Sequence, residues 1–279
     1  MTNHVFQQVD VFTTAAFGGN PLAVIVGADR LSDQQMASIA NWTNLSETTF
    51  LLSPTDPNAD YRVRIFTPER ELPFAGHPTL GSCHVWLVTG GAPKRDEIVQ
   101  ECGAGLVRIR RDGTRLAFAA PPLRRGGDVA PELLARLANG LRIDPAAIKA
   151  SQWVDNGPGW VAVMLATRSE VLALRPDFPS LGGQPLGVVA PCNPDRDKID
   201  ADFEVRGFIT TRAAEDPVTG SLNASLAQWL IPAGLAPEAY IASQGTVIGR
   251  KGRVHVARID DDIWIGGDTL TCVEGTINI

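Results

Sequence analysis

The chain has 279 residues, 44% hydrophobic and 20% charged, which is the composition of a globular protein with room for two domains. Its net charge of −6 gives no basic surface that could release counterions, so we expect no nucleic-acid partner. The apolar runs are far shorter than the roughly 20 residues that cross a bilayer. Residues 1–4 lack the basic and apolar segments of a leader. We therefore expect a cytoplasmic protein with no membrane partner.

The first half of the chain predicts many strands and two helices. A capping box of Ser32 with Gln35 marks the start of the first helix, with Leu31 as its hydrophobic staple. That helix should end at about residue 41. The second helix, over residues 79–88, has little polar face and should be buried nearly all round. Strands are predicted at residues 5–12, 22–26, 48–52, 61–66, 98–101, 106–110 and 115–119.

The second half repeats this order after a linker at residues 121–128 that is rich in proline and arginine. A second buried helix is predicted at residues 221–230. Further strands are predicted at residues 161–165, 203–209, around 247, 253–257 and 263–265. Many strands around one buried helix in each half differ from the βαβ alternation of parallel-sheet folds.

The expected fold class is therefore α+β, with two pseudo-symmetric lobes. Each lobe should be a curved or barrel-like, mostly antiparallel sheet around a central buried helix. The N-terminal lobe is expected at residues 1–121, completed by the last strand at about 267–279. The C-terminal lobe is expected at residues 122–266.

A repeated pattern relates the two halves. Glu-x-Pro-x-x-Gly occurs at residues 71–76 and again at 215–220, and a polar residue and a helical run that ends in Trp-Leu follow each copy. Weaker matches follow in the same order, pairing residues 20–25 with 156–164, 64–66 with 206–208, and 105–107 with 245–247. Each match alone could be chance, but together they favour an ancient duplication.

Each repeat places a glycine and then a polar residue at the start of a predicted helix. Gly76 precedes His77, and Gly220 precedes Ser221. A helix N-terminus has unpaired N–H groups and a partial positive charge, so it attracts a carboxylate. Two such ends could hold one small anionic substrate. The alternative is that the glycines only permit the turn and that His77 caps its helix.

Glu47 and Asp216 are two candidate catalytic carboxylates. Glu47 lies between a helix end and a strand, where a glutamate is often merely solvated. Asp216 precedes a helix start, which it could simply cap. With the imidazole of His77, the two carboxylates could instead move protons on a bound substrate. The duplicated Glu71 and Glu215 are predicted to be structural, because both halves share them.

Other chemistries have no signal in the sequence. The four cysteines are scattered and are predicted to be buried apolar residues. The four histidines form no ligand cluster, so no metal site is expected. A glycine-rich phosphate loop and a serine-hydrolase elbow are both missing, and no cofactor is predicted. Residues 18–21 predict a backbone turn in which Asn20 bonds a neighbouring loop.

Six segments carry a family resemblance: Asp-Val-Phe at 10–12, Gly-Asn-Pro at 19–21, Asn-Leu-Ser-Glu-Thr at 44–48, Arg-Ile-Phe-Thr-Pro at 64–68, Leu-Pro-Phe-Ala-Gly-His-Pro at 72–78 and Glu-Asp-Pro-x-Thr-Gly-Ser at 215–221. In these segments the chain resembles the PhzF family, the phenazine-biosynthesis isomerases of the diaminopimelate epimerase-like fold. The resemblance runs from about residue 5 to the C-terminus and is thin between residues 125 and 200.

This resemblance implies a cofactor-independent isomerase whose active site lies in the cleft between two lobes. The family's named member moves a proton to convert trans-2,3-dihydro-3-hydroxyanthranilate to its ketone tautomer. By resemblance, Glu47 is the catalytic acid/base, and His77 and Asp216 assist it. The residues that would bind a small carboxylate-bearing substrate are Gly76, Gly220, Ser221 and Asn20. The resemblance also implies a homodimer, because family members often form one.

Two alternatives stay open from the sequence. One is an epimerase or racemase of a small amino or hydroxy acid that uses a carboxylate base. The other is a non-catalytic carboxylate-binding protein. The two-thiol racemases of this fold are disfavoured, because Ala75 precedes Gly76 and no cysteine neighbours Gly220. Leu222 and Asn223, where smaller residues are expected, and a short segment at 175–205 leave the substrate open.

Overall fold

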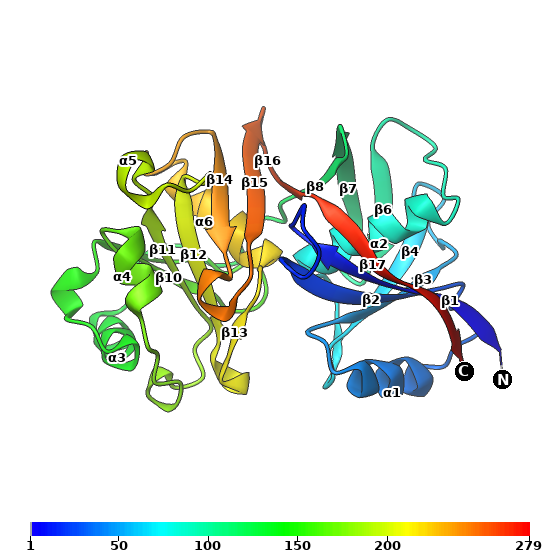
Figure 1. The fold of residues 1–279 in the computed structure, drawn as a ribbon, viewed down its shortest axis with the longest axis horizontal. Coiled ribbons are helices and arrows are strands. Elements are labelled where there is room, and N and C mark those ends of the chain that lie inside the picture. The colour runs from blue at the N-terminus through cyan, green and yellow to red at the C-terminus, as the bar shows by residue number, and fades with distance from the viewer. Residues whose placement is uncertain (1) are drawn as a thin grey trace. The chain divides into compact units, whose positions relative to one another are not determined.

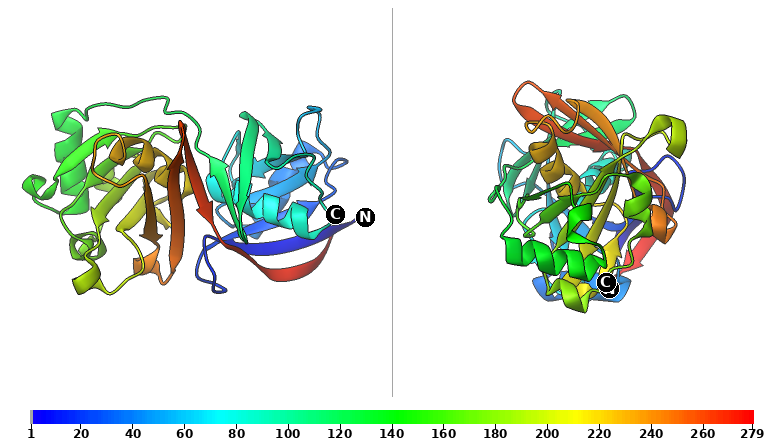
Figure 2. Two further views of the ribbon diagram at one scale, coloured as in Figure 1. Left: turned by 90° about the horizontal axis from the view of Figure 1, so that it is seen from above. Right: turned by 90° about the vertical axis from the view of Figure 1, so that its left-hand side faces the viewer.

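The computed structural model describes residues 2–279, and the chain falls into two compact units. The first unit comprises Met1–Ala119 together with Gly266–Ile279, and the second comprises Ala120–Ile265. Figures 1 and 2 trace both units by residue colour. Strands dominate each unit, most of their pairings are antiparallel, and helices are few, so the predicted α+β class is confirmed. No helix within residues 2–279 is long and apolar enough to cross a membrane.

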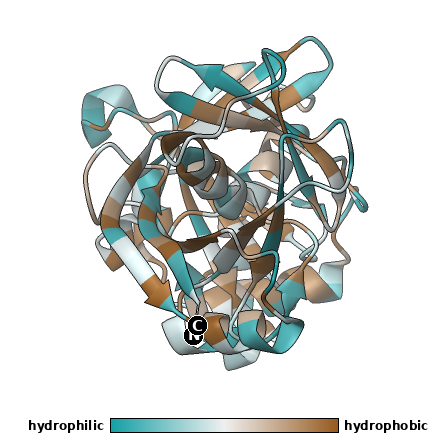
Figure 3. Ribbon diagram, turned by 90° about the vertical axis from the view of Figure 1, so that its right-hand side faces the viewer, coloured by the Kyte–Doolittle hydropathy of each residue, from teal (hydrophilic) through white to brown (hydrophobic). Residues whose placement is uncertain are grey.

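The first unit is a set of strands with one buried helix. Its strands are β1 (Asn3–Val11), β2 (Asn20–Val26), β3 (Thr48–Leu52), β4 (Tyr61–Phe66), β5 (Glu71–Leu72), β6 (Ile98–Cys102), β7 (Gly105–Asp112), β8 (Arg115–Ala119) and β17 (Thr269–Asn278). Strands β1 and β17 pair antiparallel, so the two ends of the chain lie side by side in one unit (Figure 1). Along the strands, hydrophobic and hydrophilic residues alternate, as one buried sheet face requires (Figure 3).

Helix α1 (Asp33–Thr43) starts where the sequence predicts. The Ser32 side chain accepts a hydrogen bond from the backbone N–H of Gln35, and the Gln35 side chain accepts one from the N–H of Ser32. Asn44 ends the helix in a left-handed conformation, with its N–H on the carbonyl of Ala40.

Helix α2 (Gly76–Val88) is the buried helix of the first unit, and its predicted burial is confirmed. It packs against β1, β2, β3, β4 and β8. Gly81 permits this approach, because a Cβ there would come within 2.5 Å of a methyl group of Leu22. The helix therefore holds its first turn in a position set by the surrounding strands.

The second unit repeats this plan. Its strands are β9 (Ala150–Trp153), β10 (Val161–Met164), β11 (Leu186–Pro191), β12 (Phe203–Ile209), β13 (Ala214–Asp216), β14 (Ala239–Gln244), β15 (Gly252–Ile259) and β16 (Asp262–Gly267), the last of which leads into the first unit. Its helices are α3 (Pro131–Leu141), α4 (Arg168–Ala173), α5 (Pro194–Asp197) and the buried α6 (Gly220–Leu230). Leu137 and Leu141 of α3 belong to one buried hydrophobic cluster with Val161 and Val188.

The strand predicted around Val247 is wrong. Residues 246–248 form a 3-10 turn between Gly245 and Gly249, whose φ angles are +89° and +76°. Left-handed glycines at both ends bend the backbone away from an extended path. The strand of this region is β14 at Ala239–Gln244.

The repeated motifs occupy matching positions in the strand register of the two units. Phe66 of β4 stands opposite Glu71, and Phe208 of β12 stands opposite Glu215. In each unit, the arginine two residues before the phenylalanine binds the glutamate through two guanidinium nitrogens, at 2.7 Å twice in the first unit and at 3.0 and 2.6 Å in the second. The guanidinium carbon lies 5.1 Å from the phenylalanine ring centre in the first unit and 4.9 Å in the second. These contacts give both glutamates the structural role that the sequence predicts.

The two arginine–glutamate pairs differ in burial. The side chains of Arg206 and Glu215 are only 4% and 7% exposed, whereas Glu71 is 41% exposed. Arg206 Nη1 also donates to the carbonyls of Val171 and Leu174 at 3.1 and 3.0 Å. A buried charge that loses its partner costs far more than an exposed one, so the second pair constrains its unit more strongly.

We expect Arg206→Met to lower the free energy of unfolding by about 3–5 kcal/mol, because it leaves the Glu215 carboxylate buried without its partner. The matched change Arg64→Met should cost about 1 kcal/mol or less at its more exposed pair. The double variant Arg206→Met/Glu215→Leu should regain much of the loss. Urea unfolding followed by circular dichroism measures all three, and equal losses at the two arginines would contradict this assignment.

Candidate active site

Both buried helices begin at the glycine of the repeated motif. Helix α2 begins at Gly76 and α6 at Gly220, and no side chain caps either end. The first bond into α2 is from the N–H of Thr79 to the carbonyl of Ala75. The earlier N–H groups, those of Gly76 and His77, thus precede the helical hydrogen-bond ladder. An end of this kind suits a carboxylate ligand.

Three predicted residues meet at the start of α2. His77 Nδ1 lies 3.3 Å from the Asn20 side-chain amide nitrogen, and His77 Nε2 lies 3.4 Å from Glu47 Oε2. Asn20 is the first residue of β2, and Glu47 directly precedes β3. These strands are parallel neighbours, so their starts lie at the same edge of the sheet as the first turn of the helix. Asn20 and His77 are buried, and Glu47 is 16% exposed.

The hydrogen bond from Asn20 defines the tautomer of His77. The Asn20 amide donates to Nδ1, so in the neutral ring the proton is on Nε2, where it faces the acceptor-only carboxylate of Glu47. Burial lowers the pKa of His77 to about 3. At neutral pH the ring is therefore uncharged and presents one N–H beside Glu47.

A close backbone approach positions Asn20. The N–H of Gly19 donates to Asp10 Oδ2 at 3.1 Å. A Cβ on Gly19 would lie 2.1 Å from the carbonyl oxygen of Val11, so only glycine fits there. Two separate motifs of the sequence, at residues 10–12 and 19–21, thus come together in the structure. Their close approach places Asn20 next to His77.

In the second unit, Ser221 and Asp216 occupy the matching helix start. Ser221 Oγ accepts from Trp160 Nε1 at 3.3 Å, and its carbonyl accepts from the Asn156 side-chain amide at 2.8 Å. Asp216 Oδ2 accepts from the Thr219 hydroxyl at 2.6 Å. Both Ser221 and Asp216 remain partly exposed.

Sequence reasoning missed Trp160, Asn156 and Thr219 as parts of this arrangement. The signal for Asn156 was present, because the repeat pairs its segment with that of Asn20. Each of these asparagines contacts the residue that follows the helix glycine, His77 or Ser221. Trp160 has no comparable pattern, since a buried tryptophan usually serves packing.

Comparison with known proteins identifies the family. The family model of phenazine biosynthesis-like proteins (PhzC-PhzF) matches residues 9–275. The chain belongs to this family. The resemblance found in the motifs is therefore confirmed.

Relatives of this PhzF-family chain match it over nearly its whole length. Antisense-enhancing sequence 1 of Schizosaccharomyces pombe is 36% identical, over 99% of each chain. Trans-2,3-dihydro-3-hydroxyanthranilate isomerase of Pseudomonas aeruginosa is 34% identical, over 97% of this chain and 94% of that protein. The crystal structure of a PhzF-family phenazine biosynthesis protein from Enterococcus faecalis has a TM-score of 0.81 and 25% identity, covering 100% of both chains. The predicted enzyme class, isomerase, is confirmed by these matches.

Thiol chemistry is not supported at either helix start of this PhzF-family isomerase. Cys83 lies within α2, and burial raises its pKa to about 12. Burial also raises the pKa of Cys192 to about 11. Thiols with such pKa values stay protonated at neutral pH and are not available as bases. The prediction of four buried cysteines is correct for Cys83 and wrong for the other three, which are only partly buried, namely Cys102, Cys192 and Cys272. Among residues 2–279, no cluster of three or more His, Cys, Asp or Glu side chains could hold a metal ion.

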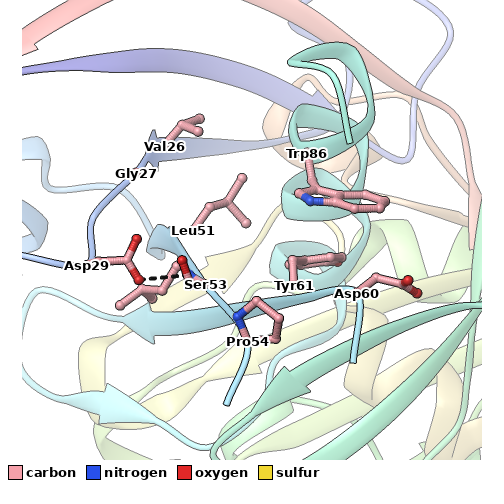
Figure 4. Close-up of a pocket in the computed structure, with 10 residues that line it drawn as sticks. Val26, Gly27, Asp29, Leu51, Ser53, Pro54, Asp60, Tyr61 and Trp86 are labelled. Carbon is pink, nitrogen blue, oxygen red and sulfur yellow. Dashed lines mark hydrogen bonds between the residues drawn. The ribbon is translucent and has the colours of Figure 1, made fainter. Parts of the chain in front are cut away.

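A shallow cavity of about 290 Å³ lies elsewhere in the first unit (Figure 4). It adjoins the C-terminal ends of β2, β3 and α2. There the rings of Trp86 and Tyr61 stack with their centroids 5.1 Å apart. Its carboxylates already accept backbone N–H groups: Asp29 from Ser53, and Asp60 from Lys94 and Val99. His77 and Glu47 lie at the opposite ends of these elements, so this cavity is not the candidate active site.

The pKa of His77 predicts how stability depends on pH. Below pH 6.5 the unfolded chain takes up a proton at this histidine, while the folded chain does not until about pH 3. Between these values, His77 therefore lowers the free energy of unfolding by up to about 1.4 kcal/mol for each pH unit that the pH falls. Above pH 6.5 it has no such effect.

We expect His77→Gln to reduce the loss of stability between pH 7.5 and pH 5 by up to about 2 kcal/mol relative to wild type. Urea unfolding at the two pH values measures this difference. Parallel losses in the two proteins would show that His77 takes up its proton equally in the folded and unfolded states.

Proposed function

We propose that this chain is a cofactor-independent isomerase that shifts a proton on a small carboxylate-bearing substrate, trans-2,3-dihydro-3-hydroxyanthranilate or a close relative. The observation that carries the proposal is the neutral His77 ring, which faces the Glu47 carboxylate at 3.4 Å beside the uncapped start of α2. A proton-transfer pair and an anion site thus lie together. The relative that is 34% identical bears the name of this reaction.

In this proposal, Glu47 is the acid/base. It removes a proton from a carbon next to an electron-withdrawing group and returns it to another carbon on the same face of the substrate. The N–H on Nε2 of His77 stabilises the carboxylate and orients it, because the ring is uncharged and Asn20 holds its tautomer. The backbone N–H groups at Gly76 and Gly220 bind the substrate carboxylate and the negative charge that develops.

We further propose that both helix starts serve one substrate molecule. The duplicated motif supports this, because it supplies two anion-binding ends with different side chains. The first end adds Glu47 and His77, and the second adds Asp216 and Ser221. A small substrate with one carboxylate and one mobile proton needs both kinds of group.

The experiment that tests the proposal is proton NMR of trans-2,3-dihydro-3-hydroxyanthranilate with the protein in deuterated water. We expect wild type to isomerise the compound with deuterium incorporation, and Glu47→Gln to be slower by roughly 10²–10⁴-fold, the usual contribution of a general acid/base. Glu71→Gln is the matched control, because Glu71 binds Arg64 away from His77. It should retain nearly full activity.

The other outcomes separate the alternatives. Deuterium exchange at a stereocentre without movement of a double bond would indicate an epimerase. Binding of the compound without turnover by wild type would favour a carboxylate-binding protein. Equal activity of Glu47→Gln and wild type would remove Glu47 from the role of base.

The tautomer of His77 gives a second prediction for the same assay. Asn20→Asp has nearly the same shape but places an acceptor at Nδ1, so the ring proton moves there and leaves Nε2. We expect kcat to fall about 10- to 100-fold, and further than in Asn20→Leu, which only removes the donor. Nitrogen-15 NMR of the His77 ring reports the tautomer directly. An unchanged tautomer in Asn20→Asp would contradict the assigned role of Asn20.

A further inference from the structure

A buried hydrogen-bond chain leads to Asp216 within the second unit. It starts at Gln244, the last residue of β14, and continues through Thr219, the residue before the first turn of α6. Gln244 Nε2 donates to the Thr219 hydroxyl at 2.9 Å, and this hydroxyl lies 2.6 Å from Asp216 Oδ2. The side chain of Gln244 is fully buried, and Thr219 is nearly so.

Backbone groups determine the direction of the hydrogen bonds in this series. Gln244 Oε1 receives the backbone N–H of Thr219 at 3.0 Å, and an N–H group can only donate. Gln244 Nε2 lies 3.2 Å from the backbone carbonyl of Asp216, which can only accept. The amide therefore has one orientation. Since the Thr219 oxygen receives a proton from Gln244, its own proton is directed to Asp216.

Three glycines make room for this arrangement. A Cβ on Gly207 would lie 2.9 Å from the Thr219 hydroxyl oxygen and 3.3 Å from Gln244 Nε2. A Cβ on Gly245 would lie 2.6 Å from the carbonyl of Pro217, and one on Gly252 would lie 2.4 Å from Val218. The loop before α6 thus packs directly onto the end of β14, which is the position that lets Gln244 reach Thr219.

Among its described residues, the first unit has no corresponding series of hydrogen bonds. By strand register, Leu72 occupies the place of Asp216, because it faces Ile65 as Asp216 faces Gly207. Ala75 occupies the place of Thr219 before the helix. The repeated arginine–glutamate pair is present in both units. The Gln244–Thr219–Asp216 hydrogen-bond chain is therefore not part of the framework that both units share.

We propose that Gln244 and Thr219 are positioning residues for Asp216. They hold its carboxylate in one orientation as a hydrogen-bond acceptor, and they also anchor the start of α6 next to Ser221. This inference rests on the proposed function in one respect, namely that Asp216 meets the substrate. The hydrogen-bond chain itself can be tested without any substrate.

The kinetic test compares Thr219→Val, Thr219→Ser and Gln244→Glu in the isomerisation assay. Thr219→Val keeps the shape and removes the hydroxyl, and we expect kcat to fall about 10- to 100-fold with KM changed less than about threefold. Thr219→Ser restores the hydroxyl and should recover activity to within about threefold of wild type. Gln244→Glu keeps an acceptor for the Thr219 N–H but now attracts the hydroxyl proton, so kcat should fall as in Thr219→Val.

The spectroscopic test observes the hydroxyl proton of Thr219 by NMR in the full-length protein. In wild type it should be a slowly exchanging downfield signal, as a buried hydroxyl bonded to a carboxylate gives. Gln244→Glu should shift this signal and the carboxyl carbon signal of Asp216. Thr219→Ser should leave the Asp216 signal in place and show an equivalent slowly exchanging signal from the serine hydroxyl. Thermal unfolding of each variant checks that it is folded.

The outcomes are distinguishable. Unchanged signals of Asp216 and Thr219 in Gln244→Glu would overturn the inference. Equal kcat in Thr219→Val and wild type would also overturn it, because Asp216 would then need no positioning. If wild type does not isomerise the compound, the proposed function fails, and the NMR signals alone decide whether Gln244 and Thr219 orient Asp216.

Discussion

A buried helix start without a side-chain cap is the constraint that the two units share. Helices α2 and α6 are enclosed by strands, so their first N–H groups must find partners in a place that water reaches poorly. Gly76 and Gly220, the first residues of the two helices, are themselves buried. Helix starts of this kind suit a carboxylate ligand.

The two units share one structural framework and differ in the residues at their helix starts. Both units keep an arginine bound to a glutamate across adjacent strands, and these contacts recur in the same register. The residues at the helix starts have diverged. The first unit offers an uncharged imidazole beside Glu47, while the second offers Asp216 at the end of a directed hydrogen-bond chain.

The sequence predicted the local features well, because short-range physics decides them. The capping box at Ser32 and the burial of α2 are examples. The strand predicted around Val247 is wrong, because the prediction relied on hydrophobicity alone. It ignored the two left-handed glycines that flank this residue. Trp160 and Gln244 escaped notice because their importance lies in what they contact, far along the chain. The cytoplasmic location and the homodimer stay predictions.

The sequence by itself determined the family, the α+β class and the list of candidate residues, because motif spacing and periodicity are local and survive without coordinates. Only the tertiary structure decided how those residues are arranged. It placed the starts of β2, β3 and α2 together, which buries His77 and makes it neutral beside Glu47. It also brought Gln244 to Thr219. Burial and hydrogen-bond direction arise from packing between distant segments, and no single segment encodes them.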